Sequence, residues 1–184
     1  QVVRTPWGEP SGPLTRGRLE GVDLVFLARH GYGHTIAPHE INYRANIWAL
    51  KESGVDGIVA VATVGGIRET FGPGTLVLPD QLIDYTWGRP STYFQGPEQP
   101  VTHVDFTLPY DAAVRDRLAR AGDALGETIV VGGTYGCSQG PRLETAAEIH
   151  RMERDGCDLV GMTGMPEAAL ARELGMPYAT LAVV

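Results

Sequence analysis

The segment from Leu24 to Gly31 joins an apolar run to residues that can bind an anion. Residues 24–28 are apolar, and Arg29, His30 and Gly31 follow them directly. In an open α/β sheet, ligands bind at the carboxyl ends of the strands. The arginine fork matches phosphate geometry, histidine can add a charge-assisted hydrogen bond, and glycine lets the backbone approach the ligand. This order of residues therefore predicts an anion site, most simply for phosphate.

The Arg-His-Gly sequence alone leaves two other interpretations open. An arginine and a histidine after a strand can belong to a surface loop or to a structural ion pair. Histidine phosphatases and phosphomutases also have a strand that ends in Arg-His-Gly, and there the histidine is the nucleophile. The rest of the chain has to decide between these functions.

Composition restricts the class of protein. The chain has 184 residues, of which 43% are hydrophobic and 20% charged, which is typical of one globular domain. The net charge of -7 argues against a surface for nucleic acid or anionic membranes. No apolar run is long enough to cross a bilayer and no signal peptide is visible, so we expect a cytoplasmic protein. The two cysteines, Cys137 and Cys157, form no disulfide framework, and no Cys/His spacing predicts a metal site.

Both ends of the chain have unusual sequences. The chain starts with Gln1 rather than methionine and ends within the apolar run 178–184. A buried parallel strand needs further chain to cover it. We therefore expect the native protein to begin before Gln1 and to continue past Val184.

The order of elements predicts an α/β fold. Apolar runs alternate with segments of helical periodicity, which is typical of a parallel or mixed sheet flanked by helices in a single domain over 1–184. We expect strands over 23–28, 57–64, 74–78, 128–133, 158–162 and 178–184, and helices over 41–53, 111–124, 144–155 and 166–174. Because 57–64 is apolar throughout, both faces of that strand should be covered. The stretch 86–109 is rich in Pro, Gly and aromatic residues and is predicted to be a functional loop.

Several further motifs occur in a fixed order along the chain. They are Thr5-Pro6-Trp7-Gly8-Glu9-Pro10-Ser11, Arg29-His30-Gly31, His34-Thr35-Ile36-Ala37-Pro38, Ile41-Asn42-Tyr43-Arg44-Ala45-Asn46, Gly65-Gly66-Ile67-Arg68-Glu69, Leu78-Pro79-Asp80-Gln81-Leu82-Ile83-Asp84, Gln139-Gly140-Pro141-Arg142-Leu143-Glu144-Thr145 and Gly161-Met162-Thr163-Gly164-Met165-Pro166-Glu167. This ordered set resembles the trimeric purine nucleoside phosphorylase family, and most closely its methylthioadenosine/methylthioinosine phosphorylase branch. A histidine phosphatase would not have the last two motifs. The resemblance implies a nucleoside phosphorylase-like α/β domain with a central mixed sheet.

The resemblance also implies a reaction. Phosphate attacks C1′ of a purine nucleoside and releases the free purine and a ribose 1-phosphate, through a transition state like an oxocarbenium ion. The site must hold phosphate beneath the sugar and stabilise charge on the base. No metal or organic cofactor is expected, phosphate being a co-substrate, and the protein is expected to be a homotrimer that binds neither nucleic acid nor membranes.

The resemblance assigns the phosphate and sugar contacts to the ends of three strands. Arg29, His30 and Thr163 match the family's phosphate ligands. Ala62 and Thr63 match positions whose backbone and side-chain donors contact phosphate and sugar. A threonine before Gly65 can instead simply pack in its strand.

The resemblance places the base beside Glu144. In relatives that cleave 6-oxopurine nucleosides, a Phe-Glu-Thr motif supplies a glutamate that accepts from N1–H, whereas methylthioadenosine phosphorylases usually have serine there. A carboxylate accepts from a protonated N1 but repels the bare N1 lone pair of adenine. Leu143 replaces the aromatic residue of the motif, and Met162 is expected to pack under the ribose. Alternatively, Glu144 is a solvated carboxylate at a helix start and Met162 is a core residue.

The least specific assignment is His103. It resembles the histidine that the methylthio branch donates across the trimer interface to the 5′ end of the neighbouring subunit's substrate. A loop histidine can equally be an ordinary surface residue.

The segments that should complete the site lie beyond the two ends of the chain. The family's Gly-rich phosphate loop would precede Gln1, and the Asp or Asn that contacts purine N7 would follow Val184, so no catalytic residue is assigned. Base preference therefore depends on Glu144, which favours a 6-oxopurine nucleoside such as S-methyl-5′-thioinosine. The alternatives are a methylthioadenosine phosphorylase, a general inosine/guanosine phosphorylase, or a purine-binding module without activity.

Overall fold

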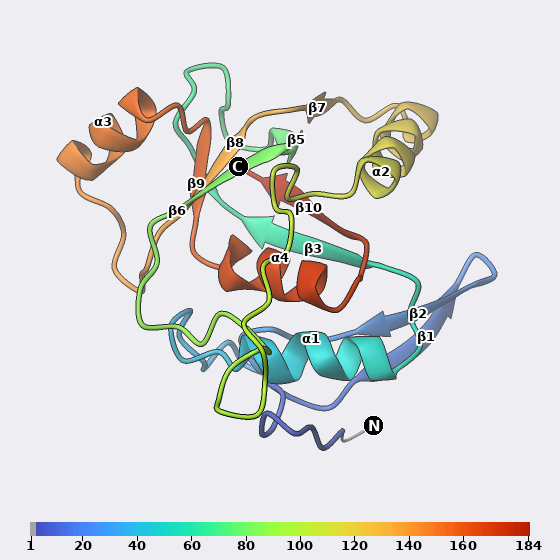
Figure 1. Ribbon diagram of the computed structural model, residues 1–184. Helices are drawn as coiled ribbons and strands as arrows, with labels where there is room; N and C mark the ends of the chain where they lie inside the picture. The colour runs from blue at the N-terminus through green and yellow to red at the C-terminus, as the bar shows by residue number, and fades with distance from the viewer. Residues whose placement is uncertain (1–2) are drawn as a thin grey trace.

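The computed structural model describes residues 3–184 and shows an α/β fold with helices around two adjoining mixed sheets (Figure 1). The strands are β1 Thr15–Leu19, β2 Val22–Phe26, β3 Ile58–Thr63, β4 Gly65–Gly66, β5 Leu76–Leu78, β6 Gln81–Asp84, β7 Ile129–Val131, β8 Thr134–Cys137, β9 Leu159–Gly161 and β10 Tyr178–Val183. The helices are α1 Tyr43–Glu52, α2 Ala112–Leu125, α3 Ala146–Arg154 and α4 Gly164–Glu173. Gln1, before which we expect further chain, lies outside the described residues.

Short connections along the chain link the two four-stranded sheets. The first has the order β3-β10-β5-β7 and the second the order β4-β9-β8-β6. The chain passes from the first sheet to the second three times with only one or two residues between strands, from β3 to β4, from β5 to β6 and from β7 to β8. In the connection from β7 to β8, Gly132 and Gly133 have φ of 107° and 124°, a conformation that residues with a side chain rarely adopt. Each sheet mixes parallel and antiparallel pairs, as the sequence predicted.

The helices cover the sheets through short apolar faces. α4 packs against β10 and α1, whereas α2 packs against β10 and β7. In Figure 1, α4 lies between β3 and α1. Ala45 and Ala49 of α1 are buried, and so is Ile41 just before the helix. The centre of the core includes Val77, Tyr135, Leu159, Ala168 and Leu170, all of them inaccessible to solvent.

Each expected strand and helix is present, with ends that differ by at most two residues, and 86–109 contains no helix or strand. Two expectations about strands are wrong. The strand expected over 23–28 ends at Phe26 and pairs only with β1 in a separate hairpin, so among the described residues it is not part of a central sheet. The strand expected over 57–64 is covered on one face only, because no described element packs over Val59 and Val61, which remain 45% and 61% exposed.

The sequence interpretation missed β1, β4, β6 and β8. These are short strands with glycine or polar residues, such as Gln81 and Thr134, and so lack a continuous apolar run. Among the helices of the described chain, none has both the length and the apolar composition required to cross a bilayer.

Candidate functional site

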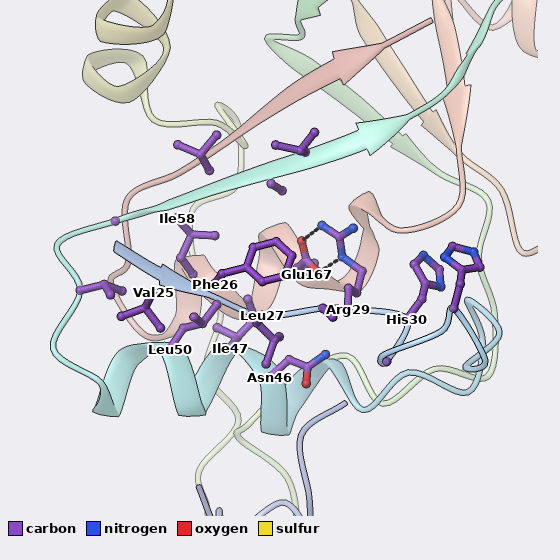
Figure 2. Close-up of a pocket in the computed structure, with 18 residues that line it drawn as sticks. Val25, Phe26, Leu27, Arg29, His30, Asn46, Ile47, Leu50, Ile58 and Glu167 are labelled. Atoms are coloured by element: carbon purple, nitrogen blue, oxygen red, sulfur yellow. Dashed lines mark hydrogen bonds and ion pairs between the residues drawn. The ribbon is translucent and has the colours of Figure 1, made fainter. Parts of the chain in front are cut away.

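Arg29 lies just beyond the β1–β2 hairpin and forms an ion pair with Glu167 of α4. Its Nε donates to Oε2 of Glu167 at 2.6 Å and its Nη2 donates to Oε1 at 2.9 Å (Figure 2). Burial by itself lowers the pKa of Arg29, but the charge of Glu167 and its hydrogen bonds outweigh burial and raise the pKa above its ordinary value. The structural ion pair, which was one of the interpretations that the sequence left open for Arg29, is therefore present. Among the hydrogen bonds of residues 3–184, none involves Nη1 of Arg29.

His30 is held by the turn that follows it. Its Nδ1 is 2.9 Å from the carbonyl oxygen of Ile36, and its ring stacks on that of His34 with centroids 4.3 Å apart. Because a carbonyl only accepts, Nδ1 carries the proton and Nε2 is left to interact with a ligand. Burial lowers the pKa of His30 below its ordinary value. The neutral ring can accept a proton from phosphate, and the protonated ring can donate to it.

A cavity of about 330 Å³ opens beside this pair. Arg29, His30 and Glu167 line its polar part, as Figure 2 shows, and apolar residues of 25–27, α1 and β3 line the rest. The combination of convergent polar groups and an apolar wall is typical of ligand sites.

The ends of β3 and β9 meet just before the start of α4. An atom placed as Cβ on Gly161 would lie 3.1 Å from Cγ1 of Val64, so the two strand ends are in contact. Thr63 is exposed and Ala62 is buried at the end of β3, while Thr163 is buried and Met162 half-buried after β9. Thr163 caps α4 without using its side chain for a cap hydrogen bond. The Met165 amide already donates to Cys137 Sγ at 3.2 Å and Pro166 has no N–H, so the side-chain group that this segment can offer to an anion is the Thr163 hydroxyl.

Glu144 is held at the end of β8 by Ser138. The Ser138 hydroxyl donates a short hydrogen bond to Glu144 Oε1, and the Ser138 amide donates to the carbonyl of Gly161 at 2.8 Å. The carboxylate that caps α3 is Glu148, which forms a reciprocal capping box with Thr145. Glu144 is therefore not needed as a cap, which argues against the alternative of a helix-start carboxylate. Leu143 beside it is 79% exposed.

A second cavity, of about 560 Å³, contains Glu144 together with Ser138, Trp87 and Arg142. Its lining shares no residue with that of the first cavity. Met162 lies against the wall of the second cavity, because a Cβ on Gly140, which lines that cavity and has φ of 61°, would lie 2.5 Å from the Met162 sulfur. Arg29 and His30 thus line the first cavity and Glu144 the second, whereas Ala62, Thr63, Met162 and Thr163 line neither.

Arg89 was missed by sequence reasoning and fixes this segment. It is 8% exposed, and its Nη1 donates to the carbonyls of Met162 and Met165 at 2.8 and 2.6 Å. Its Nη2 donates to the carbonyl of Gln139 at 2.8 Å. One guanidinium from the loop 86–109 therefore holds the segment 162–165 to Gln139, which lines the second cavity. An arginine between Gly88 and Pro90 in a loop gives no sequence signal for such a role.

His103 is not brought to the other candidates. It is exposed on the loop 86–109, whose nearby Asp105 carbonyl accepts from Arg172 at 2.7 Å, in the last turn of α4. Glu167 and Thr163 are at the opposite end of that helix. No cluster of three or more metal-binding side chains occurs among residues 3–184.

The comparisons with known proteins agree on one family. The profile of the phosphorylase superfamily matches residues 1–184. A probable S-methyl-5′-thioinosine phosphorylase of Xanthomonas campestris pv. campestris is 59% identical over 182 residues, covering 99% of this chain and 73% of the relative. The 6-oxopurine nucleoside phosphorylase of Pyrococcus furiosus is 50% identical over 189 residues, covering 100% of this chain and 71% of the relative. The crystallised methylthioadenosine phosphorylase of Schistosoma mansoni in complex with adenine superposes with a TM-score of 0.96 at 35% identity, covering 100% of this chain and 70% of that structure.

Proposed function

Because this chain belongs to the phosphorylase superfamily, we propose that it catalyses the phosphorolysis of a purine nucleoside, with a 6-oxopurine nucleoside such as S-methyl-5′-thioinosine as its substrate. Phosphate forms a bond to C1′ while the C1′–N9 bond breaks and its electron pair moves to the purine. The purine takes up a proton and leaves, and the other product is (5-methylthio)ribose 1-phosphate. The match of the phosphorylase superfamily profile to residues 1–184 confirms the family membership that the sequence motifs predicted.

The observation that carries the choice of base is the hydrogen bond from Ser138 to Glu144. It occupies Oε1 and leaves Oε2 to accept from a ligand in the second cavity. Hypoxanthine carries a proton on N1 and can donate to this oxygen, whereas adenine N1 only accepts. The relatives named thioinosine and 6-oxopurine phosphorylases support the same choice.

The phosphate would bind beside Arg29 and His30, in the first cavity. Arg29 offers Nη1, His30 offers Nε2, and Thr163 offers its hydroxyl beside the start of α4. Ala62 and Thr63 are proposed to contact phosphate and sugar from the end of β3, and Met162, which lies against Gly140 of the second cavity, to pack under the ribose. Holding both reactants in this geometry removes much of the entropic part of the barrier.

A methylthioadenosine phosphorylase is the second candidate. The high similarity to the Schistosoma mansoni enzyme, crystallised with adenine, favours it. The carboxylate of Glu144 opposes it, since adenine would place a lone pair against that carboxylate.

The proposed function is tested by following release of hypoxanthine from S-methyl-5′-thioinosine with and without phosphate. We expect release only when phosphate is present, and unchanged rates after dialysis against a chelator, because the reaction needs no metal. A protein that binds the nucleoside but releases no base would be a binding module, and release without phosphate would indicate a hydrolase. Either result would contradict the proposal.

We also propose that the protein is a homotrimer in which His103 completes the site of a neighbouring subunit. His103 is exposed, and the nearby Asp105 binds Arg172 at the end of α4 opposite Thr163, which supports a role of His103 outside its own subunit. Mixed oligomers of inactive His103→Ala and Arg29→Ala subunits should regain activity, because some sites then contain both native residues. A monomer in sedimentation that retains full activity would contradict this arrangement.

We propose a cytoplasmic location, as the sequence predicts. Cys137 and Cys157 are both free and buried, which suits a reducing environment.

A further inference from the structure

Glu167 is a deeply buried carboxylate with a partner on both oxygens. It is 5% exposed, and besides its two bonds from Arg29 it accepts a hydrogen bond from the Tyr178 hydroxyl at 2.9 Å on Oε1. Met165 has φ of -122° and ψ of 140°, so the regular part of α4 starts at Pro166 and Glu167 lies in its first turn. A carboxylate there is favoured by the helix dipole.

The position of Glu167 determines what Arg29 can offer to a ligand. The paired oxygens bind Nε and Nη2 in the plane of the guanidinium, which fixes the plane and its rotation. Figure 2 shows the two side chains facing each other along this edge. The nitrogen at the opposite corner, Nη1, makes no hydrogen bond within residues 3–184. Both side chains are largely buried, with 15% and 6% of their surfaces exposed, so solvent does little to loosen the pair.

The charges lead to the same conclusion. The ion pair carries no net charge, so Arg29 cannot attract an anion as an isolated cation would. What it retains is a directed N–H group of fixed orientation. Recognition of an anion here depends on hydrogen-bond geometry, and the geometry depends on Glu167.

We propose that Glu167 is a positioning residue for phosphate, which holds the Arg29 guanidinium so that its free corner is aimed at the phosphate oxygens. Tyr178 in turn holds the carboxylate. The inference rests on the proposed function, since phosphate is the substrate that Arg29 would bind. It assigns to Glu167 a role in catalysis although the residue does not touch substrate.

The test is the effect of Glu167→Gln on the KM for phosphate and the KM for nucleoside, measured separately. The amide keeps the shape but turns an N–H₂ group toward one guanidinium nitrogen, so the bidentate contact is lost. We expect the KM for phosphate to rise on the order of 10- to 100-fold and the KM for nucleoside to stay unchanged. Loss of a residue that orients a metal ligand weakens metal binding by a similar factor. An unchanged KM for phosphate would overturn the proposal. A lower KM would also overturn it, because it would show that Glu167 only weakens the attraction of Arg29 for an anion.

Two further variants separate positioning from folding. Glu173→Gln is the matched control, because Glu173 is on the same helix and binds Thr92 and the amide of Tyr93, both at 2.7 Å, but does not contact Arg29. It should lower stability and leave the KM for phosphate unchanged. Tyr178→Phe keeps the ion pair and removes one hydrogen bond, so the KM for phosphate should rise roughly 2- to 10-fold. This variant decides the matter if Glu167→Gln does not fold, and an unchanged KM in it would then overturn the proposal.

Binding without turnover gives an independent measurement. Inorganic phosphate alone should raise the melting temperature of the wild-type protein and of Glu173→Gln, and much less that of Glu167→Gln. If the wild-type protein releases no base with phosphate, the proposed function fails. If it does and the variants bind phosphate equally well, only the role of Glu167 fails.

Discussion

Replacing Arg29 with alanine should lower kcat/KM for phosphate by about 30- to 4000-fold, the equivalent of 2–5 kcal/mol for the loss of a charged hydrogen-bond partner. The reason is that Arg29 supplies a fixed donor in the first cavity, beside His30. Steady-state rates at varied phosphate and saturating nucleoside give this value. The KM for nucleoside should change little, because the base candidate Glu144 lines the second cavity, which shares no lining residue with the first.

The structure shows why this variant needs a partner experiment. Arg29→Ala leaves the Glu167 carboxylate buried without its counter-charge, which by itself destabilises a protein by about 3–5 kcal/mol. The double variant Arg29→Met with Glu167→Gln removes both charges and should recover much of the lost stability while phosphate use remains impaired. A stable double variant with the wild-type KM for phosphate would contradict the assignment of Arg29.

Glu144 should determine the choice of base. With S-methyl-5′-thioinosine, N1–H donates to the carboxylate, whereas S-methyl-5′-thioadenosine presents a lone pair to it. Sites built to pair a polar group reject analogues that leave it unpaired by factors on the order of 10⁴. The wild-type protein should therefore have a far higher kcat/KM on the inosine nucleoside, and Glu144→Gln or Glu144→Ser should narrow the ratio.

The neighbouring Glu148 provides the control for this experiment. It is half-buried and also lines the second cavity, but both of its oxygens accept from Arg142 and it caps α3, so Glu148→Gln should affect stability and leave the ratio of the two substrates unchanged. A wild-type protein that prefers the adenine nucleoside would show that Glu144 does not act as described, and the methylthioadenosine phosphorylase would then be the better account.

The local sequence predicted most of the fold but not its long-range contacts. Apolar runs and helical periodicity located β3, β10 and α1, because burial of one face leaves a pattern along the chain. The isolation of β2 could not be read in this way, since an apolar run does not say which strand it pairs with. The same limit applies to the site. Residues 29 and 167 are 138 positions apart, and nothing in either local sequence indicates that they meet.

The site residues differ in how far the sequence could identify them. Arg29, Thr163 and Glu144 belong to motifs whose order resembles one family, so their candidacy follows from the resemblance. Ser138 and Arg89 act through backbone and side-chain contacts that appear only in three dimensions. Whether the residues of the resemblance bind phosphate and nucleoside stays a prediction for the experiments above.

The most direct measurement of the central claim is the fate of phosphate labelled with ¹⁸O in all four positions. The protein is incubated with this phosphate and S-methyl-5′-thioinosine, and the sugar product is analysed by ³¹P NMR and mass spectrometry. If phosphate oxygen attacks C1′, the sugar 1-phosphate retains all four labelled oxygens and forms in the same amount as hypoxanthine. A free sugar that accumulates beside unconsumed labelled phosphate would show that water is the nucleophile and would contradict the account.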